Sequence, residues 1–224
     1  MGKAQKGRAG CGCLLFALVL CMIAAGALVH PFSLKIIAGR LRHEDKMVPC
    51  DAIYVPRFAE DKDGELYAEA FREYWAGDGK AIWVVNDRVF GFTVKDMVAR
   101  MAKERGIKET NAVRGIAVEG DDAAKAHLAR HALARQGVKK LIVIVPDYAS
   151  KRYQMLYSEA ASDGPAMVLI KPVHVSYFKL DKWWRDDLSR SMMEKELFRT
   201  ALLYGKRITG LKDERPKAPV PEDR

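Results

Sequence analysis

Ionisable side chains follow one run of apolar residues in this sequence. Residues 141–145 are all apolar, Pro146 comes next, and Asp147, Tyr148 and Arg152 lie just beyond it. An arginine at the start of a helix can bind an anion, and a nearby carboxylate can accept a hydrogen bond from a sugar hydroxyl or hold a metal. The pattern predicts a ligand site here, and a solvated turn between a strand and a helix is the alternative.

Polar residues also follow the other predicted strands. The carboxyl ends of parallel strands meet at one edge of a sheet, so these residues should converge. They are Arg57 after the first strand, Asn86, Asp87 and Arg88 after the second, Glu119, Asp121 and Asp122 after the third, and Lys151 beside Arg152 after the fourth. The predicted ligand-binding set is Asp147, Tyr148, Arg152, Asp121, Asp122, Asn86 and Arg57. Asp121 and Asp122 have an alternative role, because both suit the N-cap and first turn of a helix.

Histidines give a second, separate set of candidates. His127 and His131 are four apart on a predicted helix, a spacing that can bind metal, but the glutamate of an HExxH motif is missing. An exposed helix face is the alternative. His174 and Tyr177 follow the fifth predicted strand, where we expect lid or packing residues. Because no GxSxG, P-loop or GxGxxG motif is present either, the sequence assigns no catalytic residue, no metal site and no cofactor.

The elements that would position these residues alternate along the chain. Strands are predicted at 51–55, 81–85, 112–118, 141–145 and 167–170. Helices are predicted at 65–75, 94–105, 123–135, in the stretch after Arg152, and at 183–204, where Trp183 and Trp184 would pack on the sheet. This alternation predicts an α/β domain with a Rossmann-like, doubly wound, mainly parallel sheet and helices on both faces.

An uncharged segment precedes the predicted domain. Residues 11–29 contain no charged side chain and, at about 1.5 Å per residue, would form a helix of about 30 Å, enough to cross a bilayer. The basic residues before it favour a cytoplasmic start, which would place the domain on the far side of the membrane. A cleaved signal peptide is the alternative, because Ala25, Gly26 and Ala27 form an acceptable cleavage site.

The predicted organisation has five parts. They are a basic cytoplasmic tail at 1–10, a transmembrane anchor at 11–30, a juxtamembrane linker at 31–49, the α/β domain at 50–211 and a disordered tail at 212–224. The linker either rests on lipid head groups through its basic side or is a plain solvated connector.

Charge and cysteine content exclude some classes of protein. The net charge is +9, and Lys3, Lys6 and Arg8 of the basic tail supply three of these charges. The rest is mildly basic and lacks a nucleic-acid-binding motif, so we expect a small anionic ligand or anionic lipid and no nucleic acid. Cys50 is the one cysteine of the predicted domain, so no disulfide can form within it.

Four stretches carry a resemblance to a known family. They are DAIYV at 51–55, GELYAEAFREYWAGDGKAIWVV at 64–85, GVKKLIVIVPDY at 137–148 followed by Arg152, and KELFRTALLYG at 195–205. Over residues 51–205 the chain resembles the SanA/YdcF-like family, the bacterial domain of unknown function 218. The resemblance implies an anchor in the bacterial inner membrane, a Rossmann-like domain on its periplasmic or extracytoplasmic side, and a role in envelope integrity or cell-wall polysaccharide biogenesis.

The chain also departs from the family pattern. Asp147, Tyr148 and Arg152 match it, but Pro56, Arg57 and Phe58 replace a glycine-rich loop, Asp121 and Asp122 or their neighbours replace an Asn-Thr pair, and Ala149 replaces a loop histidine. The histidine would have been a proton carrier at neutral pH. Its absence implies binding without catalysis, or a different ligand.

Three functions follow from these observations. The first is a membrane-anchored envelope protein that binds an anionic sugar- or nucleotide-like ligand, which can be a lipid-linked sugar. The second is a noncatalytic, degenerate domain that acts through protein contacts. The third is a transferase or hydrolase with an altered acidic site, in which Asp121, Asp122 or Asp147 is the base.

Overall fold

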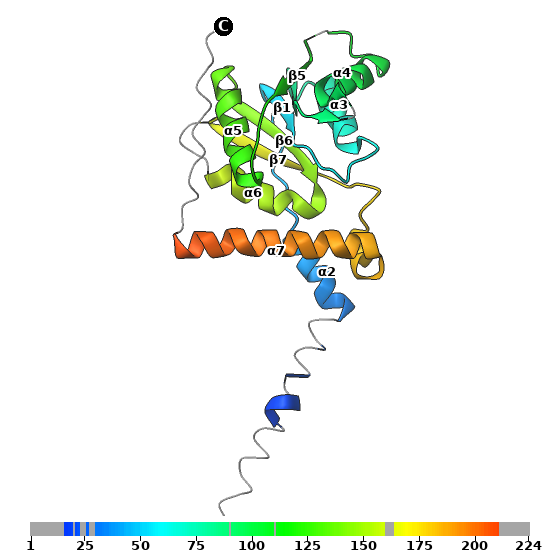
Figure 1. Ribbon diagram of the computed structural model, residues 1–224, viewed down its shortest axis with the longest axis vertical. Coiled ribbons are helices and arrows are strands. Elements are labelled where there is room, and N and C mark those ends of the chain that lie inside the picture. Colours follow the sequence, from blue (N-terminus) through cyan, green and yellow to red (C-terminus); the bar gives the residue numbers. More distant parts are fainter. Residues whose placement is uncertain are drawn as a thin grey trace, which may run out of the picture. The chain divides into compact units, whose positions relative to one another are not determined.

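Five parallel strands form the centre of the computed structural model (Figure 1). The strands are β1 (Ala52–Val55), β2 (Ile82–Val85), β5 (Val113–Ile116), β6 (Lys140–Pro146) and β7 (Met167–Val173). Their order in the sheet is β5-β2-β1-β6-β7, and every neighbouring pair is parallel. The predicted parallel α/β sheet is therefore confirmed.

The structure describes residues 16–19, 21–22, 26, 30–89, 91–109, 111–159 and 164–210. Residues 1–39 form one unit and residues 40–224 a second, which contains the sheet. Helix α2 (Pro31–Arg40) precedes the sheet.

Four helices connect the strands, and a fifth follows them (Figure 1). They are α3 (Glu65–Ala76), α4 (Val94–Glu104), α5 (Asp122–Arg135), α6 (Ser150–Glu159) and α7 (Asp187–Thr209). The chain steps from β1 outward to β5, then returns past β1 to β6 and β7. Because parallel crossovers are right-handed, this reversal places α3 and α4 on one face and α5 and α6 on the other, as in a doubly wound sheet.

Strand β6 lies at the centre of the hydrophobic core. Its residues from Leu141 to Val145 have no exposed surface, because helices cover both faces of the sheet. Ile142 pairs in register with Ile53 of β1 and Leu169 of β7. The uninterrupted apolar run of the sequence thus corresponds to a strand buried on both sides.

Helix α7 runs across the carboxyl end of the sheet and packs on α6 and on the 3₁₀ turn η1 (Asp147–Ala149). It was predicted at 183–204, and both ends of that prediction are wrong. Trp183 and Trp184 lie instead in a 3₁₀ segment, η2 (Leu180–Arg185). Asp186 ends that segment with an extended backbone and starts α7, because its carboxylate accepts the N–H of Ser189 at 3.0 Å.

Two further elements differ from the sequence-based expectation. Strand β7 continues past residue 170 through Pro172, which is tolerated because β7 is an edge strand. A short antiparallel hairpin, β3 (Arg88–Val89) and β4 (Phe92–Thr93), occupies part of what was predicted as a turn.

The predicted membrane segment 11–30 falls largely outside the described residues, as do the tails 1–10 and 212–224. Among the residues that the structure describes, no helix is long and apolar enough to span a bilayer. Part of the predicted linker 31–49 is bonded to the domain: Asp45 exchanges hydrogen bonds with Ile170 of β7, at 3.1 Å through its N–H and 2.8 Å through its carboxylate.

Candidate functional site

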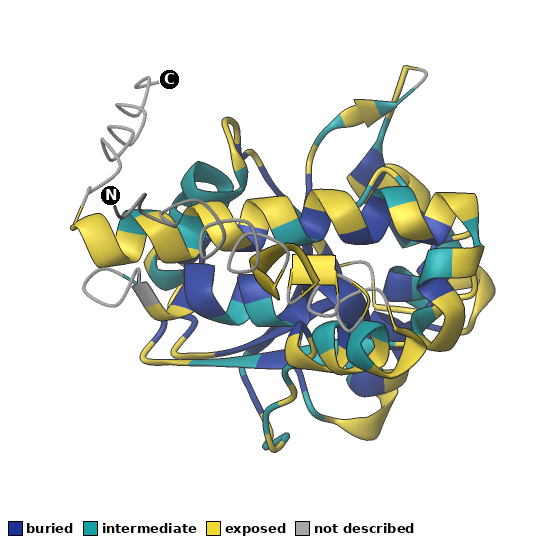
Figure 2. Ribbon diagram, turned by 90° about the horizontal axis from the view of Figure 1, so that it is seen from below, coloured by how far each residue is buried: buried dark blue, intermediate teal, exposed yellow. Residues whose placement is uncertain are grey.

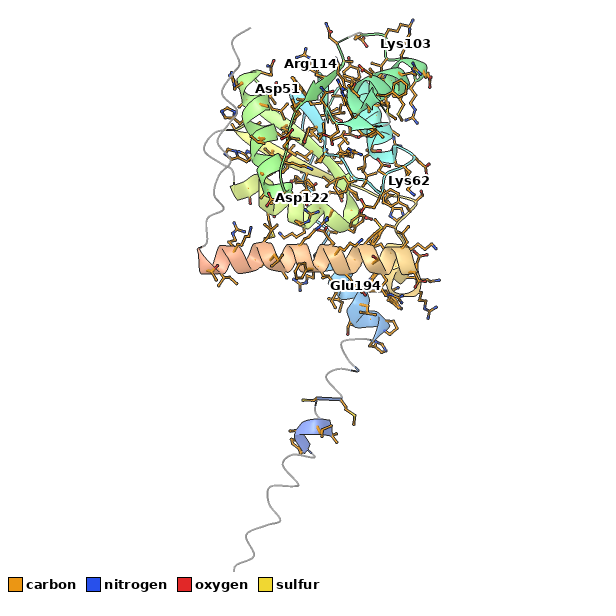
Figure 3. All side chains as sticks on the ribbon, viewed as in Figure 1. Asp51, Lys62, Lys103, Arg114, Asp122 and Glu194 are labelled. Carbon is orange, nitrogen blue, oxygen red and sulfur yellow. The ribbon has the colours of Figure 1, made fainter. Side chains whose placement is uncertain are left out.

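The carboxyl ends of β1 and β6 define the point at which the sheet reverses its winding. Open α/β sheets bind ligands in the crevice at this point, because the loops of the two neighbouring strands leave in opposite directions. Here the loop after β1 carries Arg57, and η1 follows β6 and carries Asp147 and Tyr148. Helix α5 begins at Asp122 nearby, on the side of α7 that faces the sheet (Figure 3).

Arg152 pairs with two carboxylates of the same chain. Its Nε donates to Glu196 Oε1 of α7 at 2.7 Å, and its Nη1 donates to Asp122 Oδ2 of α5 at 2.5 Å. The side chains of Arg152 and Glu196 are 2% and 3% exposed. Burial acts to lower the pKa of Arg152, but the hydrogen bond and charge of Glu196 outweigh it, so the pKa is raised and the guanidinium stays charged. This cluster, the α5–α6–α7 clamp, joins the first turns of α5 and α6 to α7.

A small cavity lies beside the carboxyl end of β1 and has a volume of about 30 Å³. It is lined by Tyr54, Pro56, Arg57, Val85, Asp122, Lys125, Ala126, Tyr153 and Tyr157. Small-molecule sites usually measure about 300–1,000 Å³, and one water occupies about 30 Å³ in the liquid. This cavity therefore has room for water and not for a nucleotide or sugar.

Asp147 and His174 form a hydrogen-bonded pair at the carboxyl ends of β6 and β7. His174 Nδ1 lies 3.1 Å from Asp147 Oδ2, and Asp147 Oδ1 accepts the N–H of Tyr148 at 2.8 Å. The Asp147 side chain is buried, whereas that of His174 is 73% exposed. An acceptor at Nδ1 favours the tautomer that carries its proton there, which leaves Nε2 as the basic nitrogen. A buried carboxylate that orients an exposed imidazole is the arrangement of a general base.

The loop that follows His174 is bonded to α3 and packs on η1. Ser176 donates to Glu65 at the start of α3 through its N–H at 2.9 Å and also through its hydroxyl. The ring of Phe178 packs on Tyr148, with centroids 4.5 Å apart. These contacts fix the loop relative to η1 and therefore position the imidazole.

The surroundings of Tyr177, three residues after His174, are acidic. Burial raises the pKa of Tyr177 well above its ordinary value, and the carboxylates of Asp61, Glu60 and Glu65 add to the effect. The phenol therefore stays neutral. A local negative field suits hydroxyl groups better than it suits an anion.

The other predicted site residues have separate roles. Arg57 Nη1 donates to Asp87 Oδ2 at 2.9 Å, so these two residues from adjacent strand ends pair with each other. Asp121 is the N-cap of α5 and accepts the N–H of Ala124 at 2.8 Å, which confirms the alternative interpretation of this residue. The side chain of Asn86 lies against the backbone of Gly115. A Cβ atom at position 115 would come within 3.1 Å of Asn86 Cγ.

The structure thus brings Arg152 together with Asp122, and Asp147 with His174, but it does not assemble all predicted residues into one site. Sequence reasoning missed Glu196 and treated His174 as a lid or packing residue. Nothing local marks Glu196, which lies 44 positions from Arg152. The position of His174 after β7, the neighbour of β6, was the available signal.

Within the described residues, no group of three His, Cys, Asp or Glu side chains gathers around a point that could hold a metal ion. His127 and His131 are half-buried on α5. A larger groove, of about 970 Å³, runs along α4 beside Ile107 and Val113, and none of the predicted site residues lines it.

The sheet and the Asp147–His174 pair together define a doubly wound α/β protein with a candidate acid–base site at the carboxyl edge of the sheet. No family model, curated protein or solved structure matches the chain.

Proposed function

We propose that this chain is a membrane-anchored envelope protein of the SanA/YdcF-like type that carries out general acid–base chemistry on a sugar-containing envelope molecule. The observation that carries the proposal is the pair formed by buried Asp147 and exposed His174. The resemblance over residues 51–205 supports the envelope role, and the uncharged segment 11–29 supports the anchor.

The pair has the parts that a hydrolysis or transfer reaction needs. Nε2 of His174 would take the proton from a water or a sugar hydroxyl as its oxygen attacks the substrate. Asp147 would hold the imidazole in place and stabilise the imidazolium, which then returns the proton to the leaving oxygen. His174 therefore supplies the proton carrier that Ala149 lacks, from a different strand end.

The ligand expected from the structure is less anionic than the sequence suggested. Arg152 was the strongest candidate for an anion contact, but its charge is balanced by Glu196 and Asp122. Of the carboxylates near Tyr177, Glu60 would bind a sugar hydroxyl. We therefore propose that the sugar part of the ligand lies at His174.

A second candidate function is a noncatalytic domain that acts through protein contacts. The specific observation in its favour is the small volume of the cavity beside the carboxyl end of β1, about 30 Å³. A fold with little space at its usual ligand crevice can serve a function other than catalysis.

Turnover assays on the full chain test the acid–base proposal. The substrates would be nucleotide sugars and lipid-linked sugars, with products followed by mass spectrometry. His174→Ala should lower kcat by about 10²- to 10⁴-fold with a smaller change in KM, because a general base acts in the transition state. Asp147→Asn should lower kcat through misplacement of the imidazole. His131→Ala, a half-buried histidine of α5, is the matched control and should leave turnover unchanged.

Equal turnover in the wild type and His174→Ala would remove His174 from the reaction. A folded wild-type chain that turns over none of the substrates would favour the noncatalytic candidate.

A further inference from the structure

Helix α7 carries apolar side chains that point away from the domain. Phe198, Leu202 and Ile208 are 65%, 50% and 84% exposed. Phe198 and Leu202 are four residues apart, so they lie one above the other on the same face of the helix. The half of α7 towards its C-terminus is mostly exposed in Figure 2. We call Phe198, Leu202 and Ile208 the outer strip.

The orientation of the outer strip is set by buried contacts on the opposite face. Met193, Glu196 and Thr200 are buried against the domain. Glu196 is fastened to Arg152 at 2.7 Å, and the clamp therefore prevents α7 from rolling its apolar side chains inward. The outer strip is therefore a fixed surface of the domain. Exposing its apolar side chains to water is unfavourable, which suggests that another surface covers them.

Basic residues border the outer strip. Lys195 is exposed beside Phe198, and Lys206 and Arg207 lie in the last turn of α7. Arg199 is also exposed, but its Nη1 lies 4.0 Å from Asp122 Oδ2 of the domain. Glu194 is an exposed acidic residue on the side of α7 away from the sheet (Figure 3). Apolar side chains flanked by an excess of Lys and Arg are typical of helices that lie in the head-group region of anionic membranes.

The chain enters the domain at the first turn of α6, the helix whose Arg152 is bonded to α7. Leu41 O accepts the N–H of Lys151 at 2.9 Å, and His43 N–H donates to Ser150 Oγ at 2.8 Å. Both contacts are to the first turn of α6, which also carries the clamp residue Arg152. The ten residues of α2 measure about 15 Å along a helix, which is the length of chain between the predicted anchor and this turn.

We propose that the outer strip of α7 binds the surface of the bilayer in which residues 11–29 are anchored. Phe198, Leu202 and Ile208 would lie among the head groups, and Lys195 would pair with an anionic lipid phosphate. Because α7 packs on η1, this contact would hold the Asp147–His174 pair near the membrane surface, where a lipid-linked sugar is presented. The inference rests on the anchoring part of the proposed function and is independent of the acid–base part.

Photo-crosslinking of the full chain in vesicles tests this contact. Leu202 would be replaced by p-benzoylphenylalanine, and the chain reconstituted in phosphatidylethanolamine with phosphatidylglycerol. Irradiation should give a lipid adduct at position 202. The same replacement at Lys103, an exposed residue of α4 far from α7 in Figure 3, should give none. Lys195→Glu, or vesicles of phosphatidylcholine alone, should lower the adduct yield at position 202 several-fold.

The outcomes separate this inference from the proposed function. An anchored chain that gives no lipid adduct at position 202, or a chain-to-chain adduct in its place, would overturn the lipid contact and leave the anchor standing. A chain that fails to remain with the vesicles would overturn the anchor, and the lipid contact of α7 with it.

Discussion

Arg152 shows what a single residue's position can and cannot predict. An arginine at a helix start after a buried strand requires an anionic partner, and the structure provides two, Glu196 and Asp122. The requirement is predictable because a buried guanidinium cannot lose its proton at ordinary pH. The identity of the partner is not, because Glu196 approaches only after α7 has crossed the edge of the sheet. Asp147 was likewise predicted, but its partner His174 comes from another strand end.

Removing one side of the clamp should destabilise the domain. Arg152→Met leaves Glu196 buried beside an apolar side chain, and we expect the free energy of unfolding to fall by about 3–5 kcal/mol. The double variant Arg152→Met with Glu196→Met should recover much of this loss, because no unpaired charge is then buried. Arg190→Met breaks the exposed pair with Asp187 and should cost less than about 1 kcal/mol. Urea denaturation of the four proteins measures these differences.

A double variant as unstable as Arg152→Met alone would contradict this account. It would mean that the clamp contributes through packing and not through charge compensation.

At the scale of elements, the sequence predicts strands better than it predicts the ends of the last helix. Four of the five sheet strands stand out because each contains at least four consecutive apolar residues, whereas Arg114 and Gly115 interrupt β5. Trp183 and Trp184 continue the apolar pattern of α7 toward its N-terminus and conceal the break at Asp186. The Asp186 carboxylate stabilises that break by accepting hydrogen bonds from Ser189 and Lys179, and hydrophobic periodicity does not reveal such contacts.

The cap at Asp186 should make the stability of α7 dependent on pH. Hydrogen bonds from Lys179 and from the N–H and hydroxyl of Ser189 lower the pKa of Asp186 to about 2, from 3.8. A carboxylate whose pKa is lower in the folded state stabilises that state above the unfolded pKa, and the contribution is lost as the pH falls through the folded pKa. The advantage of the wild type over Asp186→Asn in urea denaturation should therefore be constant above about pH 5 and shrink between about pH 4 and pH 2.

Lys179→Met supplies the control for this pH effect, because it removes the largest contributor to the lowered pKa. The free energy of unfolding of Lys179→Met should therefore change less between about pH 4 and pH 2 than that of the wild type. A difference between wild type and Asp186→Asn that does not change with pH would show that the charge of Asp186 has no part in the cap.

At the scale of the whole molecule, the fold predicts one location for a ligand and the side chains favour another. Strand order places the usual crevice between β1 and β6, but the cavity that Tyr153 and Tyr157 line beside β1 is small, and the clamp joins α7 to Asp122 in its lining. The candidate site lies instead toward β6 and β7, at His174. Topology is readable from alternating elements, whereas cavity volume depends on side-chain packing across several elements.

Anchoring of the whole chain is the remaining step on which the envelope role depends. Residues 11–29 are uncharged and follow a basic start, so the full chain expressed in a bacterium should stay with the membrane fraction after carbonate washing. The domain should be degraded by protease added outside spheroplasts, because the basic start favours retention of that end in the cytoplasm. A chain that lacks residues 1–29 should be absent from the membrane fraction after washing and should resist the protease.

Intact-mass measurement distinguishes the two interpretations of the segment: an anchor keeps residues 11–29, whereas a signal peptide cleaved after Ala27 gives a chain that begins at Leu28. The cleaved product would lose the anchor, and with it the reason to expect α7 at a membrane surface.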